Sequence, residues 1–479
     1  MRKATPLLEK TPFAIDETPM QGALSANAGL AAVSRVLRSL ELGPACQAWL
    51  NIKQRKRGYA PAQFIESLVM LNAAGGDCMQ DMNLLREDSA MEKMLGYGVP
   101  STRAVGDFLA RFHDEEKLAA ARGEAQQQAR LAFIVEENEA LQGLHEVRCA
   151  MIARQAQISP LPDIATIDQD ATIIESRKRE ATYTYKGMKG YQPMVAAWAE
   201  AGLIVADEFR DGNVPAQMAP LNCAKQAFAA LPGTMQALFF RGDSACHESG
   251  LINWLRNESR EGGPQGFIGF SVSARMSPEL AQTLRAVPEE QWKTFGHDRD
   301  GTVRQWAELD FVPGEKTEKK DIVPLRYVGL RLAKAQGELF ADGNEHHYHA
   351  ILTNRWDMDG GDLITWNRAK AGTIEHVHDE MKNGLAAGQL PSAKLGANAA
   401  WFRIACIAFN IMSALRQAWP DESVQKAHPK RLRFVIFATA GRFVRDRRKI
   451  SLRFAASKKW IQNLIALFKA FPVVTRATG

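Results

Sequence analysis

Apolar side chains recur every three or four positions in three early stretches of the chain, residues 25–42, 60–76 and 89–116. This spacing predicts amphipathic helices, because it places the apolar residues on one helical face. The third stretch contains a Gly/Pro turn and a Ser101–Thr102 cap, so it is predicted to hold two helices joined by a turn. That is the outline of a helix-turn-helix module, although two packed helices of an ordinary bundle have the same outline.

Glycine positions and one polar stretch complete this helical region. Gly43 is expected to end the first helix, and the Gly75–Gly76 pair is expected to end the second. Residues 117–154 are polar and rich in Glu, Gln and Ala, and they predict a long connecting helix.

Beyond Pro160 the apolar pattern changes from helical spacing to short β-branched and aromatic runs. Residues 163–176 (DIATIDQDATIIES) predict a strand, and residues 193–213 predict a hairpin that turns at Ala201–Gly202. Helical and strand-like segments then alternate up to residue 272. The predicted order is β-β-β-α-β-α-β, which indicates a mixed sheet flanked by helices.

The alternation stops between about residues 271 and 362. This stretch is too long for a connection and contains strand-like pieces, so we expect an inserted β-rich subdomain. Helical spacing resumes at residues 367–391, and the next predicted helix, residues 397–419, is strongly apolar. Arg403 and Asn410 interrupt that run, which falls short of the roughly 20 apolar residues of a membrane span.

The composition is that of a multidomain globular protein. The chain has 479 residues, of which 46% are hydrophobic and 24% are charged. Its six cysteines are scattered without a C-x-x-C pair, which fits reduced thiols and disfavours zinc ribbons and redox motifs. The first residues lack the apolar run of a signal peptide. We therefore expect a cytoplasmic protein that does not enter a membrane.

Charge is distributed unevenly along the chain. The whole chain carries +6, but residues 426–459 hold twelve Lys or Arg and one acid, a net +11, which leaves −5 for the rest. Such a segment favours a polyanionic partner, either nucleic acid or an anionic membrane surface, over a merely solvated basic face. If the partner is nucleic acid, the cations there that we expect to contact its phosphates include Arg445, Arg447, Arg448 and Lys449.

Three acids stand where metal-dependent chemistry could take place. Asp170 is on the first predicted strand, Asp243 ends a later apolar strand, and Glu375 lies on the helix after the insertion. The first and fourth strands of such a sheet can be neighbours, so carboxylates at their ends can meet. Clustered carboxylates need a counter-charge, which Mg²⁺ supplies, and a pair of such ions can promote phosphodiester displacement.

Each of these acids has an ordinary alternative when it is taken alone. Asp243 could cap the following helix, and Glu375 could be a surface residue, with Asp379 or Glu380 in its place. Asp168 would point to the same face of the strand as Asp170, since the side-chain period of a strand is two. Only the ordered set of strand, strand and helix favours a metal site.

Other candidate side chains lie on the same helix and in the insertion. Lys382 is seven residues after Glu375, on the same helical face, where it could touch a phosphate. His346, His347 and His349 could bind metal, but no Cys or acid has a suitable spacing. We therefore favour a structural or DNA-facing role for the three histidines.

Together these features resemble the DDE transposases of bacterial insertion sequences, over about residues 60–460. IDQDAT resembles the first-acid motif of that family, RGDSA the second-acid motif, and TIEHVHDEMKNGLAAGQLP the third-acid helix. The resemblance implies that Asp170, Asp243 and Glu375 are the catalytic acids and bind Mg²⁺, with Mn²⁺ as a substitute. It also implies that Asp168 and Thr172 support these ligands without binding metal themselves.

One part of the family pattern is missing. The third-acid helix of related transposases carries a Tyr-x-x-Arg-x-x-x-Glu-x-x-x-x-x-x-Lys signature, of which Glu375 and Lys382 match. Arg368 stands at the Tyr position and Ala371 at the Arg position. We expect the phosphate contact of that Arg to come from Lys370 or Arg368; the alternative is a weakened enzyme.

The resemblance implies an α/β RNase H-like catalytic core interrupted by a β-rich insertion, with an α-helical N-terminal DNA-binding region and a basic C-terminal segment. It implies a cut-and-paste transposase that binds terminal inverted repeats, hydrolyses the DNA at each end of the element and joins the 3′-OH ends to target DNA. A homodimer or higher synaptic complex would act on the bacterial nucleoid. Two alternatives stay open: a nuclease on the same core without strand transfer, and a decayed transposase that only binds DNA.

The expected division of the chain follows from these motifs. It comprises a helical DNA-binding region (1–115), a helical connector (116–158), the first part of the core (159–270), the β-rich insertion (271–362), the last part of the core with the third acid (363–420) and the basic C-terminal region (421–479).

Overall fold

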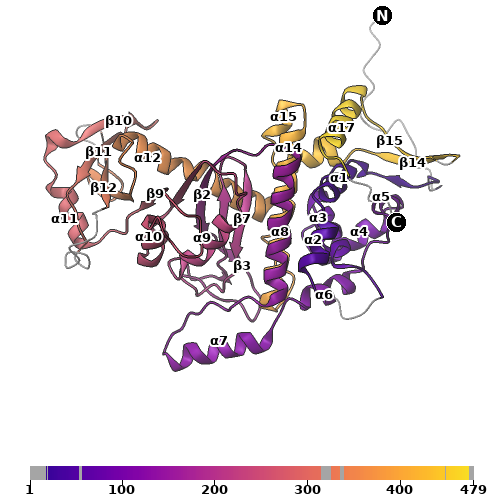
Figure 1. The fold of residues 1–479 in the computed structure, drawn as a ribbon, viewed down its shortest axis with the longest axis horizontal. Helices are drawn as coiled ribbons and strands as arrows, with labels where there is room; N and C mark the ends of the chain where they lie inside the picture. Colours follow the sequence, from indigo (N-terminus) through magenta and orange to yellow (C-terminus); the bar gives the residue numbers. More distant parts are fainter. Residues whose placement is uncertain are drawn as a thin grey trace, which may run out of the picture.

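The computed structural model describes residue 18 and residues 20–52, 57–313, 325–334, 339–447 and 449–473. A large mixed sheet lies in the middle of the molecule (Figure 1). A group of N-terminal helices lies on one side of it, and the strands within residues 293–353 extend to the opposite end.

Helices build the N-terminal part, as the apolar spacing predicted. Their bounds are α1 (Ala31–Ser39), α2 (Leu42–Trp49), α3 (Pro61–Ala74), α4 (Met82–Glu87), α5 (Met91–Leu95) and α6 (Thr102–Ala110). Gly75 ends α3 in a left-handed conformation with φ +98°. The hydroxyl of Ser101 caps α6 by accepting a hydrogen bond from the N–H of Ala104 at 3.2 Å. The predicted ends of these two helices are thus confirmed.

The predicted stop at Gly43 is wrong. The chain leaves α1 before that glycine and turns at Glu41, which has φ +58°, and Gly43 lies inside α2. Pro44 is tolerated there because the first turn of a helix leaves its N–H groups without partners in any case.

The prediction of one long connecting helix over residues 117–154 is also wrong. The structure has two helices, α7 (Glu115–Gln127) and α8 (Glu139–Ile158), joined by a non-helical stretch. Ala129 adopts a left-handed φ of +52° just after α7. Asn138 begins α8 by accepting a hydrogen bond from the N–H of Leu141 at 3.0 Å. A side-chain cap therefore divides a stretch whose composition favours helix throughout.

Nine strands form one sheet. Their spatial order is β10 (Lys293–His297), β11 (Val303–Leu309), β12 (Arg326–Ala333), β13 (His346–Thr353), β9 (Ile268–Ser273), β8 (Ala237–Gly242), β2 (Ile164–Ala171), β6 (Met194–Trp198) and β7 (Leu203–Glu208). Strand β8 is parallel to β2 and to β9, and the other neighbours are antiparallel. Within the large sheet and its helices the predicted order is confirmed as β2, β6, β7, α9 (Pro220–Ala229), β8, α10 (Ser249–Arg256) and β9, and its first and fourth strands, β2 and β8, are neighbours. The prediction missed three short strands between residues 174 and 191, and the strand predicted up to residue 176 ends at Ala171.

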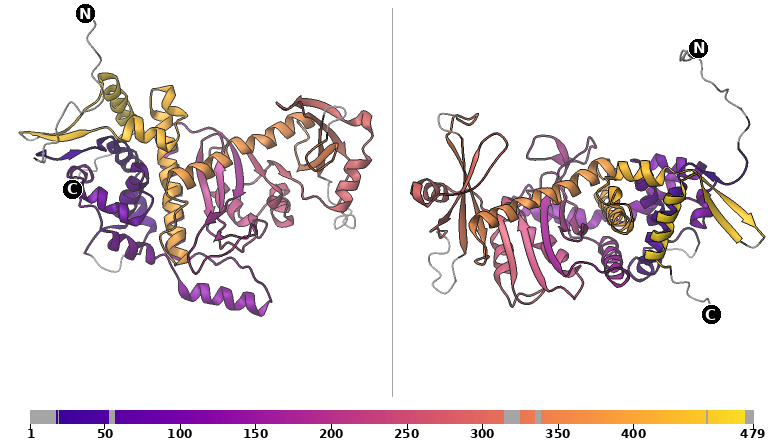
Figure 2. Two further views of the ribbon diagram at one scale, coloured as in Figure 1. Left: turned by 180° about the vertical axis from the view of Figure 1, so that it is seen from behind. Right: turned by 90° about the horizontal axis from the view of Figure 1, so that it is seen from above.

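Helices cover both faces of the central strands (Figure 2). On one face α9 packs on β2, β6 and β7, and α10 packs on β9. On the other face α13 (Ile374–Asp379) packs on β2 and β6, and α14 (Leu395–Ala418) packs on β7. The sheet is thus the middle layer of three.

The expected β-rich insertion joins this sheet instead of forming a sheet of its own. Strand β13 pairs antiparallel with β9 through Ile351, Leu352 and Thr353, and β12, β11 and β10 add to the edge beyond it. A helix, α11 (Pro278–Ala286), leads into these strands.

A broken helical run follows β13, where one helix was predicted for residues 367–391. Its parts are α12 (Gly360–Arg368), the 3₁₀ turn η6 (Ala369–Gly372), α13 and the π-helical segment η7 (Glu380–Gly384). The run ends at Gly384.

Helix α14 is apolar on all sides because it lies between two parts of the protein. It packs against β7 on one side and against α1, α3, α6 and α8 on the other, and Figure 1 shows it beside α8. It is the one helix in the described part of the chain that is long and apolar enough to cross a membrane, but 94% of its apolar window is buried within the protein. We therefore interpret it as a core helix.

The basic C-terminal region is mixed in structure. It contains α15 (Glu422–Gln425), α16 (Pro429–Leu432), β14 (Gly441–Asp446), β15 (Lys449–Phe454) and α17 (Lys458–Ala470). Strands β14 and β15 form a hairpin that pairs with β1 (Leu24–Ser25) and projects from the molecule (Figure 1). A third small sheet consists of β3 (Ile174–Glu175), β5 (Lys189–Tyr191) and β4 (Thr182–Tyr183).

Candidate active site at the ends of strands β2 and β8

Asp170 and Asp243 occupy matching positions at the ends of two neighbouring parallel strands. The β2–β8 register pairs Gln169 with Gly242; Asp170 is the next residue of β2, and Asp243 is the first residue after β8. The negative charge of Asp170 also raises the pKa of Asp243, as expected for neighbouring carboxylates. The structure therefore brings together two of the three acids that the sequence singled out.

Asp243 sits in a turn directly after β8. Its carboxylate accepts a hydrogen bond from the N–H of Ala245 at 3.0 Å and caps the 3₁₀ turn Ser244–Cys246. Burial raises the pKa of Asp243, and the charge of Asp170 raises it further, while Lys370 acts in the opposite direction. Asp243 therefore does cap the turn that follows it, which the sequence had offered as the alternative to a metal-binding role. The cap does not remove the neighbouring acid, so both roles stay compatible.

Asp170 has the opposite balance. Burial by itself would raise its pKa, but His378, Lys370 and the N–H of Ala171 lower it below the usual range. The ring Nε2 of His378 lies 3.7 Å from Oδ2 of Asp170, and Ala171 donates to Oδ1 at 3.0 Å. Two adjacent carboxylates with opposed pKa shifts mark a site where a cation would relieve repulsion.

Asp168 lies on the same strand but has a different environment. It is fully buried, and the guanidinium of Arg241 on β8 donates two hydrogen bonds to its carboxylate, of 2.7 and 2.8 Å. The hydroxyl of Thr373 also donates to it, and Arg241 donates to the carbonyl of Trp366 at 2.7 Å. Asp168 thus ties β2 and β8 to the helical run that carries Lys370 and Glu375.

Glu375 lies on α13 with an exposed side chain. Within the described residues, no hydrogen bond or ion pair joins it to Asp170 or Asp243. It is nevertheless three residues before His378, so the two side chains start about 5–6 Å apart on the helix surface. The third predicted acid is therefore next to the site but not held in it.

His378 is the residue of this site that the sequence reasoning missed. It is buried, and neither of its ring nitrogens makes a close hydrogen bond in the part of the chain that the structure describes, although Nε2 lies 3.7 Å from Asp170. A buried imidazole beside a carboxylate, with hydrogen-bonding capacity to spare, is a candidate for a role at this site. Its only signal in the sequence is the i, i+3 spacing from Glu375, which places both on neighbouring positions of one helix.

The basic residues predicted near the acids lie at different distances from them. Lys370, in η6, acts electrostatically on both Asp170 and Asp243. Arg368 is exposed at the end of α12 and lines, with Ser244, a cavity of about 460 Å³ that begins next to Asp243. Lys382 lies in the π-helical segment η7. Its predicted place on the same helical face as Glu375 assumed regular α-helical turns, and a π-helical turn holds more residues and alters that alignment.

Two further predictions concern residues away from the acids. Thr172 is buried beyond β2, where its N–H donates to the carbonyl of Pro193 at 3.0 Å. His347 pairs with Asp342 at 2.9 Å and stacks on Phe340, so it has a local structural contact in the insertion.

The predicted DNA-contacting cations lie on the β14–β15 hairpin. Arg445, Arg447 and Lys449 are exposed there. Arg448, which belongs to the same prediction, lies outside the described residues.

Comparisons with known proteins give one family. The sequence profile of the family described as transposase DDE domain group 1 matches residues 20–472. A search of the curated proteins finds no match. Among solved structures, the chain is similar to the cryo-EM structure of a piggyBac transposase synaptic complex with hairpin DNA. The identity is 13%, the match covers 93% of this chain and 80% of that chain, and the TM-score is 0.40.

Proposed function

The chain belongs to the transposase DDE domain group 1 family, and on that premise we propose that Asp170, Asp243 and Glu375 are its catalytic acids. The enzyme would cleave DNA at the ends of a mobile element and join the freed 3′-OH ends to target DNA. The observation that supports this most is that Asp170 and Asp243 each directly follow the last pair of the parallel β2–β8 ladder, Gln169 and Gly242.

The proposal includes an RNase H-like core. Its support is the central order β9-β8-β2-β6-β7, in which β2 is parallel to β8 and antiparallel to β6. The divisions proposed from the sequence go with it: a helical DNA-binding region up to residue 115, a connector up to 158 and a core interrupted at 271–362. The basic region from 421 onward would contact DNA.

DDE transposases generally use divalent metal ions, and the acids of this chain fit such ions. Asp170 and Asp243 offer oxygen ligands at one edge, and the burial and mutual repulsion that raise the pKa of Asp243 would be relieved by a cation. We propose Mg²⁺, with Mn²⁺ as a substitute. When bound, such ions activate the attacking water or 3′-OH and stabilise the leaving oxygen.

The protein's own side chains would position the DNA. We propose that Lys370 contacts the phosphate that the signature Arg contacts in related transposases, since Ala371 cannot. The support for this role is that the charge of Lys370 lowers the pKa of both acids. The contacts of Asp168 with Arg241 and Thr373 would hold the helical run over the strand ends, so that Lys370 reaches the scissile phosphate and Glu375 can bind metal.

The partners follow from the same proposal. The terminal inverted repeats and the target would be bound as DNA, and a homodimer or higher synaptic complex would hold both ends in the cytoplasm.

A cleavage assay on DNA that carries the element's own end tests the acid assignment. Asp243→Ala is expected to lose Mg²⁺-dependent cleavage and to keep end binding, because it removes one proposed metal ligand and leaves the proposed DNA-contacting cations in place. Asp163→Ala is the matched control, since Asp163 is an exposed acid at the opposite end of β2. Cleavage by Asp243→Ala at the rate of the control would overturn the assignment.

A further inference from the structure

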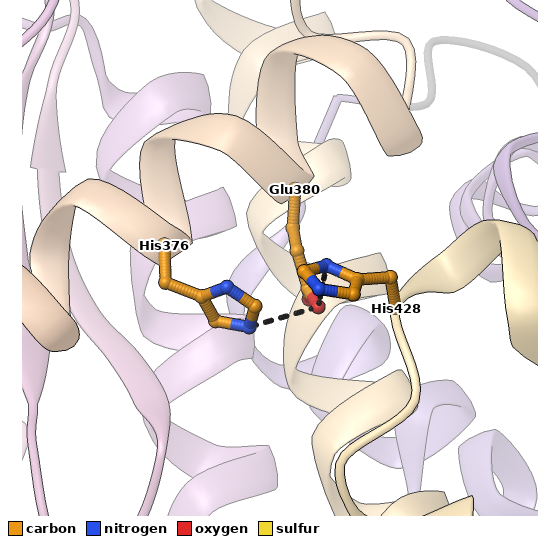
Figure 3. A group of neighbouring side chains, drawn as sticks. All are labelled: His376, Glu380 and His428. Carbon is orange, nitrogen blue, oxygen red and sulfur yellow. Dashed lines mark ion pairs between the residues drawn. The ribbon is translucent and has the colours of Figure 1, made fainter.

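A second group of metal-ligating side chains lies on the other face of the helical run. His376 on α13, Glu380 in η7 and His428 just before α16 converge (Figure 3). Their ligand atoms all lie within 4.8 Å of one another. We propose that these three residues bind one transition-metal ion of the Zn²⁺ type, separately from Asp170 and Asp243.

The distances match the geometry of a zinc site. Nε2 of His376 is 3.0 Å from Oε1 of Glu380, and Nδ1 of His428 is 3.5 Å from the same oxygen. Zinc–ligand bonds of about 2.0–2.1 Å in a tetrahedron place neighbouring ligand atoms roughly 3.3 Å apart. The two measured distances lie on either side of that value.

A hydrogen-bonded network explains the cluster less well. Three potential donors converge on Oε1 of Glu380: His376, His428 and Nη1 of Arg416, which is 2.7 Å away. A carboxylate oxygen has about two lone-pair sites. If the oxygen accepts only two hydrogen bonds, the third group cannot donate to it. When that group is an imidazole, its nitrogen lone pair points at the oxygen, which is repulsive. A cation between the three ligands removes that conflict.

Arg416 holds the carboxylate ligand in place. Its Nη1 lies 3.0 Å from Oε2 of Glu380 and donates to the carbonyl of Ala427 at 3.1 Å. It thereby fixes both the buried carboxylate and the residue before His428. Ligating carboxylates in metal sites are commonly hydrogen-bonded in this way.

The donor set and its exposure define the kind of ion. Two imidazoles and one carboxylate favour Zn²⁺, Ni²⁺, Co²⁺ or Cu²⁺ over Mg²⁺, which prefers oxygen ligands. The side chains of His376 and His428 are 41% and 58% exposed, so an ion can enter and a water can complete the coordination.

An ion at this site would connect two segments that are far apart in the sequence. His376 follows Glu375 directly, and His428 belongs to the region that leads into the basic hairpin. The ion would fasten the helix of the third proposed acid to the C-terminal region, and binding only to the folded chain would raise its thermal midpoint.

Equilibrium dialysis of the metal-free full-length chain against Zn²⁺ tests the site. The parent protein should carry Asp170→Asn and Asp243→Asn, so that the proposed catalytic acids do not contribute. We expect one tightly bound Zn²⁺ per chain and a higher thermal midpoint with Zn²⁺ than without it. His428→Ala should lose both effects, and His428→Cys, which supplies another zinc ligand, should keep them.

Cys78→Ser is the matched control, because Asp77, Cys78 and Asp81 form the other cluster of possible ligands among the described residues. It should bind Zn²⁺ like the parent. Absence of stoichiometric binding by the parent, undiminished binding by His428→Ala with a circular dichroism spectrum like the parent's, or loss of binding in Cys78→Ser would each overturn the proposal. None of these results depends on DNA cleavage, so failure of the zinc proposal would leave the proposed catalytic function untouched, and the reverse also holds.

Discussion

At the scale of single residues, Asp168 and Asp170 are two positions apart on β2 but have opposite environments. Asp168 is fully buried and paired with Arg241, whereas Asp170 is partly exposed beside the end of β8. The alternation of a strand places both on one face, so spacing alone could not separate them. The match to the family motif identified Asp170 as the candidate metal ligand. The partner of Asp168 could not be predicted, because Arg241 is 73 residues away in the sequence.

Replacement of Arg241 tests the anchoring role of Asp168. Arg241→Met leaves a buried carboxylate without its cation and is expected to destabilise the protein by about 3–5 kcal/mol in urea unfolding. Asp168→Leu combined with Arg241→Met should recover most of that stability, since an apolar pair replaces the ion pair.

Even with its stability recovered, the double variant should cleave DNA more slowly than the parent protein. It lacks the contacts from residues 168 and 241 to Thr373 and to the carbonyl of Trp366. If it is stable and cleaves at the parental rate, Asp168 and Arg241 stabilise the sheet without positioning the site.

Asp207 gives a prediction about pH. Burial would raise its pKa, but the charges of Arg403 and Arg148 outweigh burial and lower the pKa to about 2. A lowered folded-state pKa contributes stability that is present above the unfolded value near 4 and is lost as the pH falls towards 2.

We expect Asp207→Asn to be less stable than the parent at pH 5 by about 3 kcal/mol. The difference should narrow by roughly 2 kcal/mol between pH 5 and pH 2, as the parent loses this contribution. Unfolding free energies measured over that range check it, and a difference independent of pH would contradict the assigned ion pairs.

At the scale of elements, the polar residues inside α14 fasten it to the sheet. Asn410 accepts from the N–H of Ile204 at 2.8 Å and donates to its carbonyl at 2.9 Å. Its side chain therefore completes the backbone hydrogen bonds of the edge strand β7. The sequence showed Asn410 as an interruption of an apolar run, and only the packing of α14 on β7 explains it.

Asn410→Ala is expected to cost about 1–3 kcal/mol, because it leaves buried backbone groups of β7 without partners. Asn383→Ala is the matched control, since Asn383 is exposed and bonds only to Asp379. It should change stability by less than about 0.5 kcal/mol. Equal losses in the two variants would show that Asn410 does not protect the strand edge.

The β14–β15 hairpin is predicted to contact DNA phosphates. Replacing Arg445, Arg447 and Lys449 by Gln should reduce the slope of log affinity against log salt by about 2–3, since each phosphate contact contributes about 0.9. The same charge change at Arg285, Lys293 and Arg299, which are exposed in the insertion, is the control. Filter-binding titrations over several salt concentrations measure it, and an unchanged slope in the hairpin variant would refute the contact.

Local spacing predicted the element types well and the breaks poorly. It identified β2, β6, β7, β8 and β9 because their apolar runs are short and bounded by turn residues. It missed the break between α7 and α8 and the 3₁₀ and π-helical segments around α13. These breaks depend on side-chain caps and on packing against the sheet, and neither can be read from residue composition.

At the scale of the whole molecule, the site is assembled from segments about 70 and 130 residues apart, Asp170, Asp243 and Lys370. The order of strands allowed the meeting of Asp170 and Asp243 to be predicted, because parallel neighbours end at one edge. His378 was not predicted, since its role depends on how α13 lies across β2. Glu375 remains exposed, so its place in the triad rests on the family motif and not on a contact.

Strand transfer from a pre-cleaved end tests the central claim most directly. A DNA end with a free 3′-OH and a supercoiled target are incubated with Mg²⁺ and the parent protein, Asp170→Asn, Asp243→Asn, Glu375→Gln or Asp379→Asn. Asp379 is the matched control, an exposed acid on the same helix as Glu375. The parent and Asp379→Asn should join the end to the target, and the other three should be slower by on the order of 10³-fold or more, since metal-ion stabilisation amounts to several kcal/mol. Joining by Asp243→Asn or Glu375→Gln at the parental rate, or no joining by the folded parent protein, would contradict the account.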